Sequence, residues 1–320
     1  MSESEQFQSG MYELEFPAPQ LSTPDGRGPV LVHALEGFSD AGHAIRLAAE
    51  HLRDTLDTEL VASFAIDDLL DYRSRRPMMT FHTDHFTAYT DPALNLYALR
   101  DTVGTPFLLL AGLEPDLHWE RFIAAVRLLA ERLGVRQFIG LGAIPMAVPH
   151  TRPITMTAHA SDKSLIADHQ PWIGEVQVPA SVSNLLEFRL AENGYETLGF
   201  TVHVPHYLAQ TDFPPAAEAL LAEISRKASL QIPLAALGEA GAKVHSKITE
   251  QVESSTEVAQ VVSALEQQYD AFVAAQENRS LLERDEDLPS GEELGAQFEQ
   301  FLAQHTGDDE VDGTGGDTGP

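Results

Sequence analysis

The residues best suited to chemistry lie in loops that directly follow apolar runs of the sequence. The first loop reads Glu36-Gly37-Phe38-Ser39-Asp40-Ala41-Gly42 and leads into a segment with helical spacing. A glycine turn between a strand and a helix N-terminus is where α/β proteins bind anions or substrates. Its glycines match no dinucleotide or P-loop fingerprint, however, and Glu36 and Asp40 would repel phosphate. We favour the interpretation that Asp40 caps the helix and Gly37 makes a tight turn.

A second loop, Gly112-Leu113-Glu114-Pro115-Asp116-Leu117-His118, follows another apolar run. Pro115 fixes the turn, and Asp116 can cap the helix that follows. Glu114 lies where a strand is predicted to end, as Glu36 does. Two carboxylates at neighbouring strand ends could form a pair for acid–base catalysis, although the sequence does not give their separation.

Three arginines lie within four residues in a chain that is otherwise strongly acidic. Arg73, Arg75 and Arg76 could bind an anion or a carboxylate with paired hydrogen bonds. They could equally form ion pairs with carboxylates close in sequence. We favour these structural ion pairs, for which the nearby partners are Asp67, Asp68 and Asp71.

The most distinctive loop spans residues 140–153, where glycines allow a tight turn and three prolines stiffen the chain. His150 and Arg152 in this loop could offer a proton and a cation to a ligand, or the loop could be a rigid connection or an interface. His203 and His206 flank a proline at a spacing that fits no helical zinc motif. No serine elbow is present, and the sequence predicts no catalytic residue, no metal site and no cofactor.

The elements that must position these loops alternate between strand and helix. Segments 29–35, 41–56 and 60–66 predict a strand, a helix and a second strand, which implies a parallel pair with a right-handed crossover. Segments 79–81 and 86–89 predict antiparallel strands joined by a short loop, and 94–99 fits either strand or helix. Further strands are predicted at 106–111, 137–141 and 197–204, and further helices at 119–133, 181–193 and 213–229. Residues 29 to about 229 therefore predict one α/β domain with a mixed, mostly parallel sheet.

The C-terminal part has a different character. Residues 235–253 and 256–274 carry helical periodicity, which predicts a helical hairpin, or alternatively one long bent helix. Residues 290–305 fit a short amphipathic helix, and 307–320 are predicted to be disordered. The predicted organisation is an N-terminal segment (1–28), an α/β core (29–230), a helical extension (231–282) and an acidic tail (283–320).

Charge and composition exclude several classes of function. The 20 basic and 49 acidic residues give a formal net charge of −29, which disfavours nucleic acid and anionic membranes as partners. The tail from Glu283 to Pro320 carries 12 acids and one base, and we interpret it as a solvating segment. With no cysteine, disulfides, thiolate metal sites and a cysteine nucleophile are excluded. No long apolar run and no signal sequence are present, so we expect a soluble, cytoplasmic protein.

Several of these motifs together resemble the proteasome assembly chaperone 2 family, in its bacterial, actinobacterial-type branch. The motifs are Gly-Phe-Ser-Asp-Ala-Gly (37–42), Asp-Tyr-Arg-Ser-Arg-Arg-Pro (71–77), Gly-Leu-Glu-Pro-Asp-Leu-His-Trp (112–119), Val-Pro-His-Thr-Arg-Pro (148–153) and Leu-Glu-Gln-Gln-Tyr-Asp (265–270). The resemblance covers about 29–270 in unbroken order. It implies a phosphorylase/hydrolase-like α/β core with a helical extension, and self-association into rings or trimers.

The resemblance also implies a function based on binding. We expect a non-enzymatic, homo-oligomeric chaperone-like or scaffold protein, with a trimer favoured and a proteasome-related protein as a possible partner. Archaeal relatives can dock on proteasomes through a C-terminal hydrophobic–Tyr–any tripeptide, whereas this sequence ends Thr318-Gly319-Pro320. The alternative is an enzyme or a nucleoside- or nucleotide-binding protein with a pocket at the strand ends. The candidate residues for this pocket, or for an interface, are Glu36, Asp40, Arg73, Arg76, Glu114, Asp116, His150 and Arg152.

Overall fold

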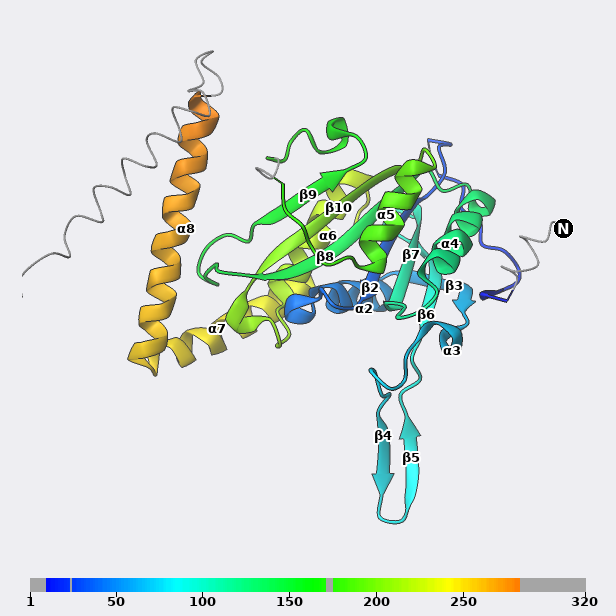
Figure 1. The fold of residues 1–320 in the computed structure, drawn as a ribbon, viewed down its shortest axis with the longest axis horizontal. Coiled ribbons are helices and arrows are strands. Elements are labelled where there is room, and N and C mark those ends of the chain that lie inside the picture. Colours follow the sequence, from blue (N-terminus) through cyan, green and yellow to red (C-terminus); the bar gives the residue numbers. More distant parts are fainter. Residues whose placement is uncertain (1–9, 24, 171–174, 283–320) are drawn as a thin grey trace, which may run out of the picture. The chain divides into compact units, whose positions relative to one another are not determined.

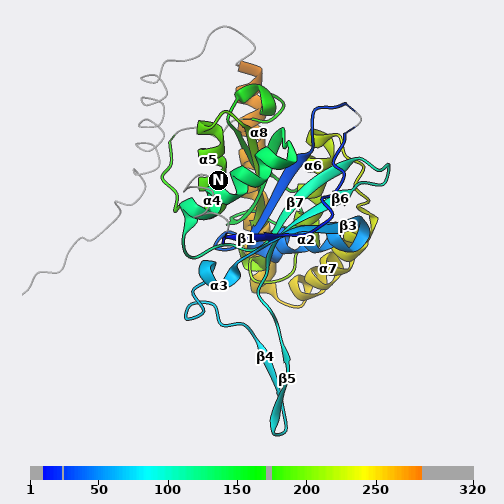
Figure 2. The ribbon, with the colours of Figure 1, turned by 90° about the vertical axis from the view of Figure 1, so that its right-hand side faces the viewer.

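The apolar runs of the sequence form the strands of one eight-stranded sheet, which helices cover on both faces (Figures 1 and 2). The computed structural model describes residues 10–23, 25–170 and 175–282. The strands of the sheet are β1 (Tyr12–Leu14), β2 (Val30–Glu36), β3 (Asp57–Phe64), β6 (Leu94–Arg100), β7 (Pro106–Leu113), β8 (Gln137–Met146), β9 (Met156–Ala160) and β10 (Glu196–Pro205). The helices are η1 (Ala41–His43), α2 (Ala44–Thr55), α3 (Ile66–Leu69), α4 (Trp119–Leu133), η2 (Lys163–Ile166), α5 (Val182–Glu192), η3 (His206–Leu208), α6 (Pro214–Ala228), α7 (Ala235–Glu253) and α8 (Thr256–Leu282).

The sheet is mixed, with its parallel strands at the centre. The order is β1-β3-β6-β7-β2-β8-β10-β9, in which β7, β2, β8 and β10 are parallel neighbours and the outer pairings are antiparallel. The α/β fold class with a mixed sheet and a C-terminal helical part is therefore as predicted. The predicted direct pairing of β2 with β3 is wrong, because β6 and β7 lie between them. The ambiguous segment 94–99 is the strand β6.

Alternation of side chains along β2 explains why the sheet has two buried faces. Val30, Val32 and Ala34 pack into one apolar core with α2 and α6, whereas Leu31 and Leu35 pack into a second core with α4 and α5. A strand that is buried on both faces reads as a continuous apolar run, and this run is what located β2 in the sequence.

A separate two-stranded hairpin projects from the sheet, formed by β4 (Met79–His82) and β5 (His85–Tyr89) (Figures 1 and 2). The antiparallel pair predicted here is confirmed. Every residue from Met78 to Thr90 is exposed, so the hairpin packs against neither of the two cores.

The C-terminal residues form two helices, α7 and α8, separated at Ser254 and Ser255. The chain divides into two compact units, Met1–Glu266 and Gln267–Pro320, and every site considered below lies in the first. The predicted amphipathic helix at 290–305 and the predicted disordered end at 307–320 fall outside the described residues.

Candidate functional site

Two clefts lie at the carboxyl ends of β2 and β7, where the alternative interpretation of the sequence places a ligand pocket. One has a volume of about 530 Å³ and the other of about 710 Å³, and both are lined by Glu36 and Arg75. The smaller cleft also contains Arg53, Arg76 and Tyr97. The larger cleft also contains Asp40, His43, Arg46 and Asp116. The carboxyl ends of parallel strands are a common place for ligands in α/β sheets.

Two carboxylates of the larger cleft have raised pKa values. Burial raises the pKa of Glu36, and the nearby charge of Asp40 adds to the effect. Burial also raises the pKa of Asp40, although its carboxylate accepts hydrogen bonds from the backbone N–H groups of Ile45 (2.7 Å) and Arg46 (3.3 Å). Asp40 therefore caps the first turn of α2, whereas Glu36 is directed at the clefts.

Glu114 lies beside Glu36 in the sheet but makes a different set of contacts. Its side chain is almost fully buried at 5% exposure, and it lines neither cleft. One carboxylate oxygen accepts the N–H of Phe38 (3.2 Å) and the other accepts the N–H of Val182 (2.6 Å) at the start of α5. A Cβ on Gly37 would lie 1.7 Å from the Glu114 Oε2 atom, so the glycine makes room for this carboxylate. Glu114 thus joins the β2 turn to α5.

The arginine-rich loop is fixed by a carboxylate that is distant in sequence. Arg75 forms an ion pair with Asp116 (2.6 Å), and Asp116 also accepts the backbone N–H of Asp71 (2.9 Å). Asp116 therefore organises this loop, whereas we expected it to cap α4. Arg76 is exposed and lines the smaller cleft, while Arg73 is exposed outside both clefts.

His150 and Arg152 lie away from the two clefts. The Nδ1 atom of His150 is 2.7 Å from the hydroxyl of Tyr207, and the ring lies 5.5 Å from that of His245 on α7. Burial lowers the pKa of His150, and the His245 ring contributes in the same direction. Arg152 forms an ion pair with Glu266 (3.2 Å). These two residues hold the loop after β8 against the helical part of the first unit.

A polar cluster that sequence analysis missed lies between the sheet and α5. His33 on β2 is fully buried, with its Nδ1 atom 3.0 Å from the Ser183 hydroxyl and its Nε2 atom 3.5 Å from a Glu187 carboxylate oxygen. The other oxygen of Glu187 is 2.6 Å from the Nε2 atom of His159 on β9. The signal for this cluster was a histidine within an apolar strand, together with Gly140 in the neighbouring strand β8 and Gly199 in the next strand, β10.

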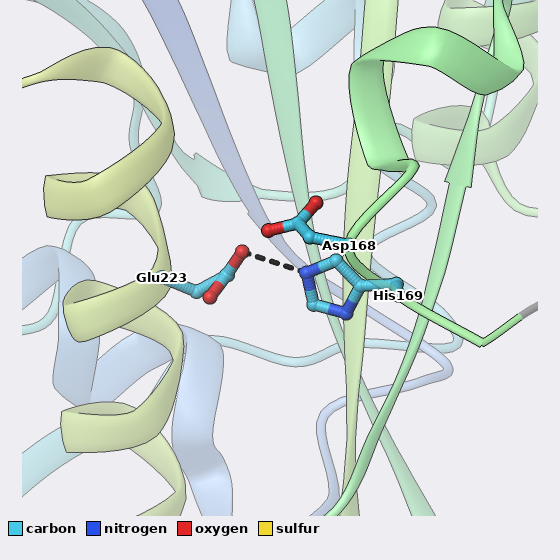
Figure 3. Close-up of side chains that lie close together, drawn as sticks. All are labelled: Asp168, His169 and Glu223. Atoms are coloured by element: carbon cyan, nitrogen blue, oxygen red, sulfur yellow. Dashed lines mark hydrogen bonds and ion pairs between the residues drawn. The ribbon is translucent and has the colours of Figure 1, made fainter.

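A second cluster joins the segment after η2 to α6 (Figure 3). Asp168, His169 and Glu223 place their ligand atoms close enough together to suggest a metal site. The cations of Arg226 and Lys227 already bind this cluster: Arg226 pairs with Asp168 and Glu223, and Lys227 pairs with Asp168. The hydrogen bond from Lys227 is the main cause of a strongly lowered pKa for Asp168. The cluster is therefore a network of ion pairs and does not fit a bound metal.

No helix within residues 10–23, 25–170 and 175–282 is long and apolar enough to cross a membrane. The fold and its clefts define a mixed-sheet α/β protein with a C-terminal helical part and candidate ligand sites at its strand ends. The chain belongs to the PAC2 family, whose model matches residues 34–252. This confirms the family resemblance inferred from the motifs.

Three solved structures resemble the chain. A Mycobacterium tuberculosis protein of unknown function is 76% identical over 85% of this chain and 92% of its own, with a TM-score of 0.84. A Corynebacterium glutamicum protein of unknown function is 45% identical over 82% of this chain and 98% of its own, with a TM-score of 0.79. A second M. tuberculosis protein, described as a proteasome-assembly chaperone homologue, is 25% identical over 73% of this chain and 99% of its own, with a TM-score of 0.67. No curated protein matches the chain.

Proposed function

We propose that this protein is a homo-oligomeric, chaperone-like scaffold. In this role it binds other proteins and does not act as an enzyme. Membership of the PAC2 family supports a chaperone-like role, and the similarity to a proteasome-assembly chaperone homologue supports a proteasome-related partner. The cytoplasm is the compartment in which we expect this role.

The observation that carries the proposal is the apolar face of the β4–β5 hairpin. Residues directly opposite each other share a face, so Met79 lies with Tyr89 and Phe81 with Phe86. Met79 and Phe81 are two residues apart in one strand and lie on the same side. These four side chains are 45–63% exposed. An isolated two-stranded hairpin is only marginally stable in water, and clustered exposed apolar side chains mark interaction sites.

Charge favours a second copy of the chain as the occupant of this face. Two copies that each carry a formal net charge of −29 repel one another over most of their surfaces. Between Met78 and Thr90 the only charged side chain, with histidines taken as neutral, is Asp84. The hairpin therefore combines apolar side chains with the low charge that contact between like copies requires.

The oligomeric state tests this assembly. We expect sedimentation of the full chain to give a particle larger than 35.0 kDa, with a mass three times that value favoured. The double variant Phe81→Ser/Phe86→Ser should sediment as a monomer. Phe188→Ser is a matched control, because Phe188 on α5 is as exposed as Phe81 (58% each) and should leave the particle unchanged. A monomeric wild type, or a double variant of unchanged size, would contradict the proposal.

Co-purification tests the choice of partner. Tagged full-length protein should recover proteasomal subunits from its host under mild conditions, both with and without the residues after Arg279. Failure to recover any proteasomal subunit would count against the proteasome-related role while leaving the self-assembly proposal intact.

A second candidate function is the binding of a small nucleoside- or nucleotide-like ligand. The supporting observation is that both clefts share Glu36 and Arg75, so one ligand can meet a carboxylate and a guanidinium together. Arg53 and Arg76 add positive charge for a phosphate, and Tyr97 adds an aromatic surface. Nucleotides should raise the melting temperature of the wild type, and less so that of Arg76→Ala. The absence of any shift at millimolar nucleoside or nucleotide would exclude this function.

A further inference from the structure

The cluster beneath α5 has the parts of a hydroxyl activated by a base. Ser183 and Glu187 lie one turn apart on α5, and both face His33 on β2. His33 is 0% exposed and Glu187 is 7% exposed, whereas Ser183 is partly exposed. Ser183 is therefore the member of the series Glu187–His33–Ser183 that lies partly at the surface.

The sheet is shaped to hold this cluster. Gly140 on β8 and Gly199 on β10 are partners in the parallel ladder. A Cβ at Gly140 would lie 2.0 Å from the Glu187 Oε1 atom and 2.6 Å from the His33 Cε1 atom. A Cβ at Gly199 would lie 2.3 Å from the Nε2 atom of His159. Two neighbouring strands thus lack side chains where the imidazoles and the carboxylate lie.

The contacts select the tautomer of His33. The Nε2 atom of His33 has no hydrogen-bond partner among the described residues and lies 3.5 Å from a Glu187 carboxylate oxygen. The negative charge of this carboxylate favours the proton on that nitrogen. The Nδ1 atom then has a free lone pair and accepts the hydroxyl proton of Ser183 at 3.0 Å. Burial lowers the pKa of His33, although the charge of Glu187 acts in the opposite direction, and the lowered pKa favours the neutral imidazole.

His159 balances the buried carboxylate. Its side chain is 46% exposed and lies 2.6 Å from Glu187. Burial acts to lower the pKa of His159, but the hydrogen bond to Glu187 and its charge outweigh this and raise the pKa. The raised pKa favours the charged form of His159, which compensates the Glu187 charge from the surface side and leaves the second carboxylate oxygen beside His33.

We propose that Ser183 is a nucleophile for acyl transfer from small activated esters, with His33 as its general base and Glu187 as the positioning residue. Ser183 Oγ forms a bond to the acyl carbon while its proton moves to the Nδ1 atom of His33. The ester C–O bond breaks, and the leaving alcohol takes that proton. Water then attacks the acyl-serine, again giving its proton to His33, and releases the acid and the free Ser183 hydroxyl.

This chemistry goes beyond the scaffold role and does not depend on it. The cluster lies in the first unit against α5, whereas the proposed assembly uses the β4–β5 hairpin. Loss of the hairpin's apolar face should therefore leave the reactivity of Ser183 unchanged, and loss of Ser183 should leave the oligomer unchanged.

Labelling of the full-length protein with a small fluorophosphonate tests the proposal directly. We expect one adduct by intact mass, located on Ser183 by peptide mapping, and its complete loss in Ser183→Ala. His33→Gln should slow labelling by about 100-fold or more. Glu187→Gln should also slow it, because it weakens the orientation of His33. Ser161→Ala is the control, since that hydroxyl bonds to the backbone of Thr197, and the variant should label at the wild-type rate.

A cysteine at position 183 provides a readout that does not require a folded His33 variant. The thiol of Ser183→Cys should react with iodoacetamide with an apparent pKa below the ordinary value of about 8.5, because His33 can take the thiol proton and form an imidazolium–thiolate ion pair. The same thiol in a His159→Gln background should stay close to that lowered value. An ordinary thiol pKa, no adduct, or an adduct on another serine in the wild type would overturn the proposal.

Discussion

Replacement of Glu114 tests whether this residue is structural, as its contacts indicate. The carboxylate is 5% exposed and accepts two backbone N–H groups, those of Phe38 and Val182. A hydrogen bond to a charged group contributes about 1.5–3 kcal/mol. The bond to Val182 is buried and short at 2.6 Å, whereas the bond to Phe38 is longer at 3.2 Å and only partly buried. We therefore expect Glu114→Ala to lower the free energy of unfolding by about 3–4 kcal/mol.

Glu114→Gln separates the two bonds. Its amide oxygen can keep the bond to Val182, while its NH₂ group faces the N–H of Phe38 and cannot accept from it. The expected loss is about 1–2 kcal/mol. Urea denaturation measures both variants, with Glu131→Gln as the control. Glu131 forms an i,i+4 ion pair with Arg127 on the surface of α4, and pairs of that kind contribute only about 0.2–0.5 kcal/mol.

Gly37 turns this prediction into a double-mutant cycle. Gly37→Ala places a Cβ 1.7 Å from the Glu114 Oε2 atom and 2.6 Å from its Cδ atom, so it should destabilise the wild type. Glu114→Ala removes both of those atoms, and the cost of Gly37→Ala should fall in that background. Losses that add within about 0.5 kcal/mol would mean that the two sites are independent, and would refute this role of Glu114.

Three further predictions concern the clusters and the clefts. Gly140→Ala should lower the free energy of unfolding in urea by about 1–3 kcal/mol, because the new Cβ overlaps Glu187 and His33; an unchanged midpoint would contradict the packing of the cluster. Zinc or a chelator should leave the melting temperature of the wild type unchanged, since Arg226 and Lys227 bind the Asp168–His169–Glu223 cluster. Zinc should raise the melting temperature of the double variant Arg226→Ala/Lys227→Ala. Stabilisation of the wild type by zinc would show that the cluster binds metal. Glu36→Gln should stabilise the protein at pH 7, because the raised pKa of Glu36 means that its ionised carboxylate lowers the stability of the folded state above the folded pKa. This loss of stability disappears as the pH falls below the ordinary pKa of 4.5. The stability curves of the wild type and the variant, plotted against pH, should therefore converge near pH 4.

Local physics explains which parts of the fold were predictable. Apolar runs and helical spacing located the strands and helices because burial on one or both faces leaves a periodic trace in the sequence. The helix ends followed from single residues: Ser181 accepts the N–H of Asn184 at the start of α5, and Gly134 ends α4 with a φ of 67°. Pairing between distant strands leaves no comparable trace, so the position of β6 and β7 between β2 and β3 was not foreseen.

The positions of the strand ends also explain which candidate site residues line the clefts. Glu36, Asp40 and Arg76 line the clefts as neighbours of strand ends, whereas His150 and Arg152 do not. The reason is that β8 continues to Met146, five residues beyond its predicted end at 141, and the chain then returns as β9. The loop that carries His150 and Arg152 is thereby displaced toward α7 and Glu266.

The buried cluster was missed for a different reason, which suggests how such sites can be found. A histidine within an apolar strand is by itself an ordinary core residue. Gly140 and Gly199 carry no positive φ, so no turn explains them, and glycine weakens the interior of a strand. Gly140 and Gly199 lie in two strands that each follow a helix, β8 after α4 and β10 after α5. Glycines at these positions indicate instead that large side chains from another element lie across this part of the sheet. Because α5 connects to β10 and must pack over β8, its polar residues Ser183 and Glu187 were the available partners for His33. The histidine in an apolar strand, the two strand glycines and the polar residues of α5 together predict a buried polar cluster, although none of these signals does so alone.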